Sequence, residues 1–222
     1  MNITISRPLS WVSSKHYLVC LAAIFLVSVP VFFQAPLVRV APVLSLLLSV
    51  GILGVAQQLL VRMPTWGSLV WGFSLSWICG SIYWGWLRSE PIWHLPIEAV
   101  ALPWAIWACR RSPKHQIGAW FYLGSLIGTA ITDLYFWRIG VIAHWRSLMQ
   151  PGIDQVLTTQ LLKSALIQVE HHPAILITLA IALISTSLWG CCSVKLYKWA
   201  FAGAIFSTLI VDLIFGWAAW QC

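Results

Sequence analysis

The sequence predicts an all-α protein, a polytopic bundle of about seven transmembrane helices, with six as the alternative count. Of its 222 residues, 60% are hydrophobic and only 9% are charged, and the mean hydropathy is +0.84. A soluble domain carries about 25% charged residues, so this chain could not build a water-exposed surface. We therefore expect a single integral membrane domain over residues 1–222, with the lipid bilayer as its main partner.

Seven apolar stretches are each close to the ~20 residues that a helix needs to cross the ~30 Å hydrocarbon core. They cover residues 16–33, 38–61, 66–87, 92–109, 117–137, 173–194 and 199–220. Pro, Arg or Lys stands at most of their boundaries, as expected at helix ends. The first stretch is long and no small-residue cleavage site follows it, so we interpret it as a retained anchor and not as a signal peptide.

Basic residues set the predicted orientation. They are scattered singly between apolar runs, which is typical of topology signals and not of a nucleic-acid-binding stripe. With the N-terminus inside, the inner side holds Arg7, Lys15, Arg62, Arg110, Arg111, Lys114, Lys195 and Lys198, and the outer side holds Arg39, Arg88, Arg138, Arg146 and Lys163. This excess of basic residues favours the N-inside orientation, and it leaves the C-terminus outside.

The outer connection at residues 138–172 is too long for a tight loop. It contains no spanning run, yet apolar residues recur at helical spacing from Ile153 to Val169, opposite a polar face. This pattern predicts an amphipathic helix over residues 153–169 in the membrane interface, between spans five and six. It would serve as a structural collar, as a lid over a site, or as a docking helix for a partner.

An internal repeat relates the fifth span to the seventh. A shift of 79 residues makes seven of 17 positions identical, and these begin at Trp120 and Trp199 and end at Phe136 and Phe215. Duplication of spans four and five in spans six and seven explains the match, with coincidence and convergence on small-residue packing as alternatives. Small-xxx-small pairs at Gly72, Gly124 and Gly203 place spans three, five and seven in the predicted inner bundle.

Three of the six acidic residues lie within apolar runs, namely Glu98, Asp133 and Asp212. An ionisable group is costly there unless it is paired or hydrated. Three roles stay open: a contact that fixes helix packing, a proton or cation site, and a contact to a substrate amine. Thr129 and Thr208, one turn before each Asp, are the expected hydrogen-bond donors. Pro103 is expected to break the fourth span near Glu98.

The other candidate binding residues lie on the same outer side. They are His94, one helical turn before Glu98, Arg138, five residues after Asp133, and the adjacent His171 and His172. Glu170, His171 and His172 have metal-ligand side chains but no diagnostic spacing such as HExxH, so we predict no metal site. No catalytic motif is found, so no catalytic residue is assigned and enzyme activity is the least supported hypothesis. The sequence indicates no particular cofactor.

Cysteine and tryptophan are both explained first by packing. The six cysteines form no CxxC motif and are interpreted as small apolar packing residues. The sixteen tryptophans fill space between small residues, and stacking on a flat ligand is the alternative.

The stretch from Gly128 to Met149, GTAITDLYFWRIGVIAHWRSLM, resembles the signature region of an uncharacterised family of cyanobacterial multi-span membrane proteins, a domain of unknown function. The resemblance implies a thylakoid or plasma membrane location, with the outer side as lumen or periplasm. It implies no activity, so no residue role is carried over.

Two functions from different classes compete. The first is a small-solute or proton-coupled carrier, or a solute-binding component, with an outer-facing acidic site in the membrane. The second is a non-catalytic assembly or accessory subunit of a larger, photosynthetic membrane complex, with other membrane subunits as partners.

Overall fold

The computed structural model describes residues 13–150 and 152–221, and within them every regular element is helical. The long helices are α1 (Ser14–Val40), α2 (Pro42–Arg62), α3 (Pro64–Ile82), α6 (Gln116–Arg138), α9 (Pro173–Cys191) and α10 (Leu196–Gln221). The shorter elements are the π-helix η1 (Tyr83–Leu87), the 3-10 helix η2 (Pro91–Trp93), α4 (His94–Glu98), α5 (Leu102–Arg111), α7 (Val141–Leu148) and α8 (Gln155–Glu170). The predicted all-α bundle is confirmed.

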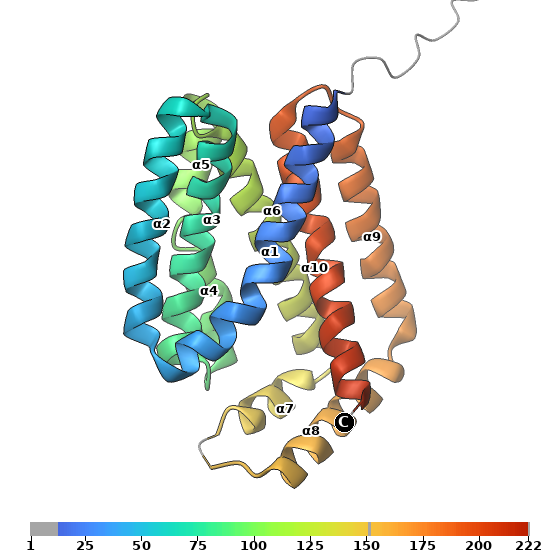
Figure 1. Ribbon diagram of the computed structural model, residues 1–222. Coiled ribbons are helices and arrows are strands. Elements are labelled where there is room, and N and C mark those ends of the chain that lie inside the picture. Colours follow the sequence, from blue (N-terminus) through green and yellow to red (C-terminus); the bar gives the residue numbers. More distant parts are fainter. Residues whose placement is uncertain (1–12, 151, 222) are drawn as a thin grey trace, which may run out of the picture.

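Six segments of the described chain are long and apolar enough to cross a membrane: α1, α2, residues 91–111, α6, α9 and α10. The predicted third span, α3, is not among them. It is 19 residues long and lies beside α2 and α6 in Figure 1. Its Gly and Ser residues make it less apolar, and most of them are buried against other helices. By length and composition alone the count is six. Helix α3 nevertheless lies within the bundle against α2 and α6 (Figure 1), so the number of crossings, seven or six, stays a prediction.

Proline explains where several helices begin and where α1 bends. Pro42, Pro64 and Pro173 each stand at the first turn of a helix, where the missing N–H costs no hydrogen bond. Pro30 and Pro36 lie inside α1, and the lower half of α1 swings toward α2 in Figure 1. An internal proline removes a backbone hydrogen bond and so allows such a bend.

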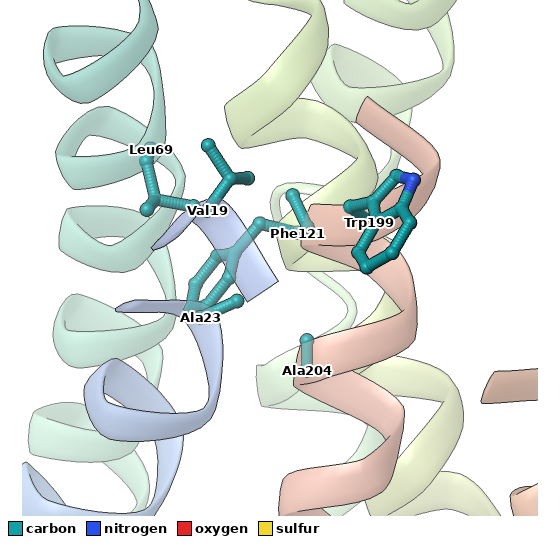
Figure 2. Close-up of a cluster of buried hydrophobic side chains, with 7 residues drawn as sticks. Val19, Ala23, Leu69, Phe121, Trp199 and Ala204 are labelled. Carbon is teal, nitrogen blue, oxygen red and sulfur yellow. The ribbon is translucent and has the colours of Figure 1, made fainter. Parts of the chain in front are cut away.

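The inner bundle is centred on α6, which packs against α3, α5 and α10. Helix α10 in turn contacts α1 and α9. Figure 2 shows the main buried cluster, in which side chains from α1, α3, α6 and α10 meet. The cluster consists of Val19, Ala23, Leu69, Phe121, Trp199, Ala200 and Ala204. The three helices predicted for the inner bundle are thus joined by a fourth, α1.

Glycines permit the closest of these contacts. A Cβ on Gly72 would overlap the backbone of Gly118, and a Cβ on Gly203 would overlap the carbonyl oxygen of Cys20. A Cβ on Gly124 would lie 2.6 Å from the carbonyl oxygen of Phe201. The small residues seen in the sequence therefore do let helix backbones approach one another.

The outer connection folds as two helices across one end of the bundle (Figure 1). The predicted amphipathic helix is α8, and Asp154 caps it by accepting a 2.7 Å hydrogen bond from the Leu157 N–H. Sequence analysis missed α7, which follows a left-handed turn at Gly140 (φ 81°). Pro151, which precedes α8 in the sequence, lies outside the described residues. We call this end of the bundle the α8 end.

The opposite end, which we call the basic end, carries most of the positive charge. The helices α1, α2 and α3, the segment α4–α5, and then α6, α9 and α10 run through the bundle in alternating directions in Figure 1. The basic residues at their ends therefore separate as the sequence predicts. Of the eight basic residues predicted for the inner side, seven lie at the basic end of the bundle. The eighth, Arg7, lies outside the described residues. Which end faces the cytoplasm stays a prediction.

Candidate functional site

The segment that carries His94 and Glu98 is a broken helix, as predicted. Helix α4 ends at Glu98, and α5 begins at Leu102 with Pro103 in its first turn. The Leu102 N–H bonds the carbonyl oxygen of Ala99, so the Glu98 carbonyl loses its usual helical donor. The Tyr122 hydroxyl of α6 donates to that carbonyl instead. The break is thereby anchored to the central helix.

His94 and Asp133 form a buried pair between α4 and α6. The His94 Nδ1–H donates to the Asp133 carboxylate, at 2.8 Å from Oδ2 and 3.1 Å from Oδ1. The two residues are only 8% and 6% exposed. A pair of titratable groups inside a membrane-spanning segment is unusual because each group alone would be costly to bury.

Three aromatic side chains cover His94. Tyr83 and Trp84 come from η1, and Trp145 comes from α7, with ring centroids 4.4, 5.7 and 5.5 Å from the imidazole. Trp84 and Trp145 stack on each other at 5.4 Å, and the Trp145 indole N–H donates to the Arg88 carbonyl at 3.3 Å. The pair is therefore closed off in this conformation, and α7 forms part of its cover.

The other two intramembrane acids lie near Asp133 but have contacts of their own. Asp212 of α10 accepts a 2.8 Å hydrogen bond from the Thr132 hydroxyl of α6, and not from Thr208 as expected. Glu98 and Asp212 are each close enough to Asp133 to interact with it electrostatically. The structure thus gathers the three acids around α6 while giving each a different environment.

The remaining predicted binding residues lie farther from this pair along the fold. Arg138 is exposed at the end of α6 and takes part in neither ion pair of the described residues, which are His94–Asp133 and Arg146–Glu90. His171 and His172 lie at the turn from α8 to α9, where the His172 Nδ1–H donates to the Gln168 carbonyl at 2.9 Å. Within residues 13–150 and 152–221, no three His, Cys, Asp or Glu side chains are placed to hold a metal ion.

Sequence reasoning missed Tyr83, Trp84, Trp145 and Thr132 as parts of the site. One signal was present for Thr132, because the repeat aligns it with apolar Val211 and so marks an extra polar residue beside Asp133. The tryptophans gave no comparable signal, since many others, such as Trp86, Trp107 and Trp217, lie exposed on the outside of the bundle. The π-helical turn at η1 was also missed, although such turns often occur at functional sites.

The fold defines a multi-pass helical membrane protein with a buried His–Asp pair in its outer-predicted half. The chain belongs to the family described as "Protein of unknown function (DUF3120)", whose model matches residues 23–220. This confirms the family resemblance, whereas a cyanobacterial origin stays a prediction. No curated protein and no solved structure matches the chain.

Proposed function

We propose that this protein is a small-solute carrier or solute-binding membrane component, with the His94–Asp133 pair as its protonatable site. The observation that carries the proposal is the 2.8 Å hydrogen bond between these two buried side chains. Histidine changes charge near neutral pH, and a titratable pair within a membrane protein is a functional candidate by default. Asp212 and Glu98 are neighbouring acids, and their carboxyl groups would interact electrostatically with a proton or cation bound at the pair.

Two features support a site that opens and closes. The break between α4 and α5 interrupts the helix next to Glu98, and discontinuous helices are common at the substrate sites of transporters. Trp145 covers His94 from α7, which leaves α6 through the left-handed Gly140. We infer that movement of α7 admits solute or protons to the pair.

The test is solute-induced current in proteoliposomes. Amino acids, sugars, organic acids and monovalent cations are applied in turn to the reconstituted protein on a solid-supported membrane, at several pH values. We expect one solute class to give a current that Asp133→Asn abolishes and Asp212→Asn weakens. Asp154→Asn is the matched control because Asp154 only caps α8.

Failure of the whole panel with the wild-type protein would remove the carrier proposal. Currents that persist unchanged in both Asp133→Asn and Asp212→Asn would remove the assignment of the site. Each variant is checked for equal incorporation into the liposomes, so that a lost current is not confused with a lost protein.

A second candidate function rests on α8. None of its residues is buried, and Val156 and Ile167 remain 68% and 50% exposed. We propose as the alternative that α8 docks onto other subunits of a membrane complex, photosynthetic if the predicted cyanobacterial setting holds. Purification in a mild detergent would then yield a larger complex, and recovery of the free monomer alone would contradict this role.

A further inference from the structure

The basic end of the bundle has positive charge with no acidic side chain to balance it. Its described basic residues are Lys15, Arg62, Arg110, Arg111, Lys114, Lys195 and Lys198. All six acidic residues of the chain lie in the other half, as do both ion pairs of the described residues. The basic end therefore presents a surface that attracts anions.

Part of this charge lies on residues 110–115, which comprise the last two residues of α5 and the turn that leads to α6, and which we call the RRSPKH turn. The Ser112 hydroxyl and His115 Nδ1 are hydrogen-bonded at 2.8 Å, and the His115 N–H donates to the Ser112 carbonyl at 3.0 Å. Gln116 also donates from Nε2 to the Cys109 carbonyl at 3.0 Å. These local bonds fix the turn and leave Arg110 and Arg111 exposed.

Contacts between aromatic rings hold the RRSPKH turn against α3 and α5. The His115 ring lies 5.5 Å from the ring of Trp71 and 6.0 Å from that of Trp104. Burial, and then the positive charge of Lys114, lowers the pKa of His115 from its usual value, so the imidazole is neutral at pH 7. The positive charge of the turn is therefore carried by Arg110, Arg111 and Lys114.

The turn stands where lipid headgroups lie. Arg111 and Gln116 are the end residues of two candidate spans, and Trp107 is 53% exposed on α5 near the same boundary. Tryptophan is enriched at this level of a membrane. An arginine guanidinium matches phosphate oxygens with two parallel N–H donors, so charge and geometry both fit a lipid phosphate.

We propose that the RRSPKH turn binds the phosphate headgroup of anionic phospholipids. Arg110 and Arg111 supply the paired donors, and Lys114 adds a third positive charge from the same turn. The hydrogen-bonded Ser112 and His115 keep these side chains together without competing for the phosphate.

The test titrates short-chain phosphatidylglycerol into the full-length protein in a neutral detergent and follows the midpoint of thermal unfolding. The variant is Arg110→Gln, Arg111→Gln and Lys114→Gln combined. Each basic side chain near an anionic lipid surface contributes about fivefold in affinity. We expect the half-saturating lipid concentration to rise by on the order of 100-fold in this variant.

The matched control removes three exposed charges elsewhere, as Arg39→Gln, Arg146→Gln and Lys163→Gln combined, and should bind the lipid as the wild type does. Equal lipid affinity in the turn variant, or an equal loss in the control, overturns the proposal. Equal stabilisation by inorganic phosphate would assign the site to the free anion and overturn the lipid assignment.

A second measurement keeps the proposal testable if the turn variant does not fold. In the wild type, added salt should weaken stabilisation by phosphatidylglycerol, because screening acts on exposed charges. Stabilisation by short-chain phosphatidylcholine should be smaller from the start and insensitive to salt. A salt-independent effect of phosphatidylglycerol contradicts binding through the turn.

Discussion

The two halves of the bundle are held together by different contacts. In the basic half, small and apolar residues such as Ala23, Leu69 and Ala204 fill the centre (Figure 2). Single hydrogen bonds to the backbone supplement this packing, as where the buried Ser68 hydroxyl accepts the Gly118 N–H. The α8 half instead buries a titratable pair and a glutamine amide between helices. Besides His94–Asp133, Gln34 of α1 donates from Nε2 to the Trp77 carbonyl at 2.8 Å and to the Ser81 hydroxyl at 3.0 Å.

We interpret the basic half as a structural scaffold and the α8 half as the part that holds the candidate site. Lipid tails are as apolar as leucine, so membrane helices associate through close packing and hydrogen bonds and not through hydrophobic burial. The basic half uses close packing together with single hydrogen bonds between a side chain and the backbone. The α8 half uses a contact between two titratable side chains, His94 and Asp133, and such a contact is costly if unsatisfied. We therefore place the candidate site in this half.

The largest expected effect comes from breaking the packing of the basic half with Gly118→Ala. Its Cβ would overlap the Ser68 carbonyl oxygen, while the Ser68 hydroxyl accepts the Gly118 N–H at 2.9 Å. Because α3 and α6 must then separate, we expect the free energy of unfolding to fall by about 3 kcal/mol. Denaturant unfolding of the protein in detergent measures the change.

Gly54→Ala is the control for this change. A Cβ on Gly54 meets no atom within 4 Å, so its effect should stay within about 0.5 kcal/mol. Equal losses in the two variants would mean that the close approach of α3 and α6 at Gly118 is not what the substitution breaks.

A somewhat smaller effect is expected from Asp133→Leu in the α8 half. The substitution leaves the His94 imidazole buried without its acceptor, which should cost about 2 to 3 kcal/mol. Adding His94→Leu removes the orphaned group, so the double variant should recover most of the lost stability. The same unfolding experiment completes the double-mutant cycle.

The double variant is then also tested for solute-induced current. Recovered stability with no current would strengthen the distinction between the packed half and the half that holds the site. It would show that the pair is dispensable for folding and required for activity. If Asp133→Leu is as stable as the wild type, the pair makes no packing contribution and the contrast between the halves must rest on the Gln34 contacts alone.

The fold could be predicted from the sequence because span length and hydropathy are local properties. The break after Glu98 was predictable for the same reason, since Pro103 removes a hydrogen bond within its own helix. Helix α7 was missed because its eight residues are too few to give a clear period inside a long connection. The π-turn at η1 was missed because the apolar run continues through it unchanged.

The members of the site were only partly predictable. Acids stand out in an apolar run because they are rare there, which identified Asp133 and Asp212. Their partners depend on how distant helices approach, and 39 residues separate His94 from Asp133. The proposed repeat also aligned the two Asp residues, but it could not show that one pairs with histidine and the other with threonine.

The smallest expected effect tests whether the basic half also responds to pH. Burial and the charge of Lys114 lower the pKa of His115, while Ser112, Trp71 and Trp104 contact its ring without adding a charge. The unfolded chain therefore binds a proton at a higher pH than the folded chain, near pH 6.5. Stability should fall as the pH drops below about 6.5 and stop falling below the folded pKa.

The loss should stay below about 1 kcal/mol because the ring is only partly buried. The variant His115→Gln has no titratable side chain at position 115. The difference between its unfolding free energy and that of the wild type should therefore change as the pH drops below about 6.5. A parallel pH profile for His115→Gln and the wild type would mean that the RRSPKH turn does not titrate, and that the pH response of the molecule belongs to the α8 half alone.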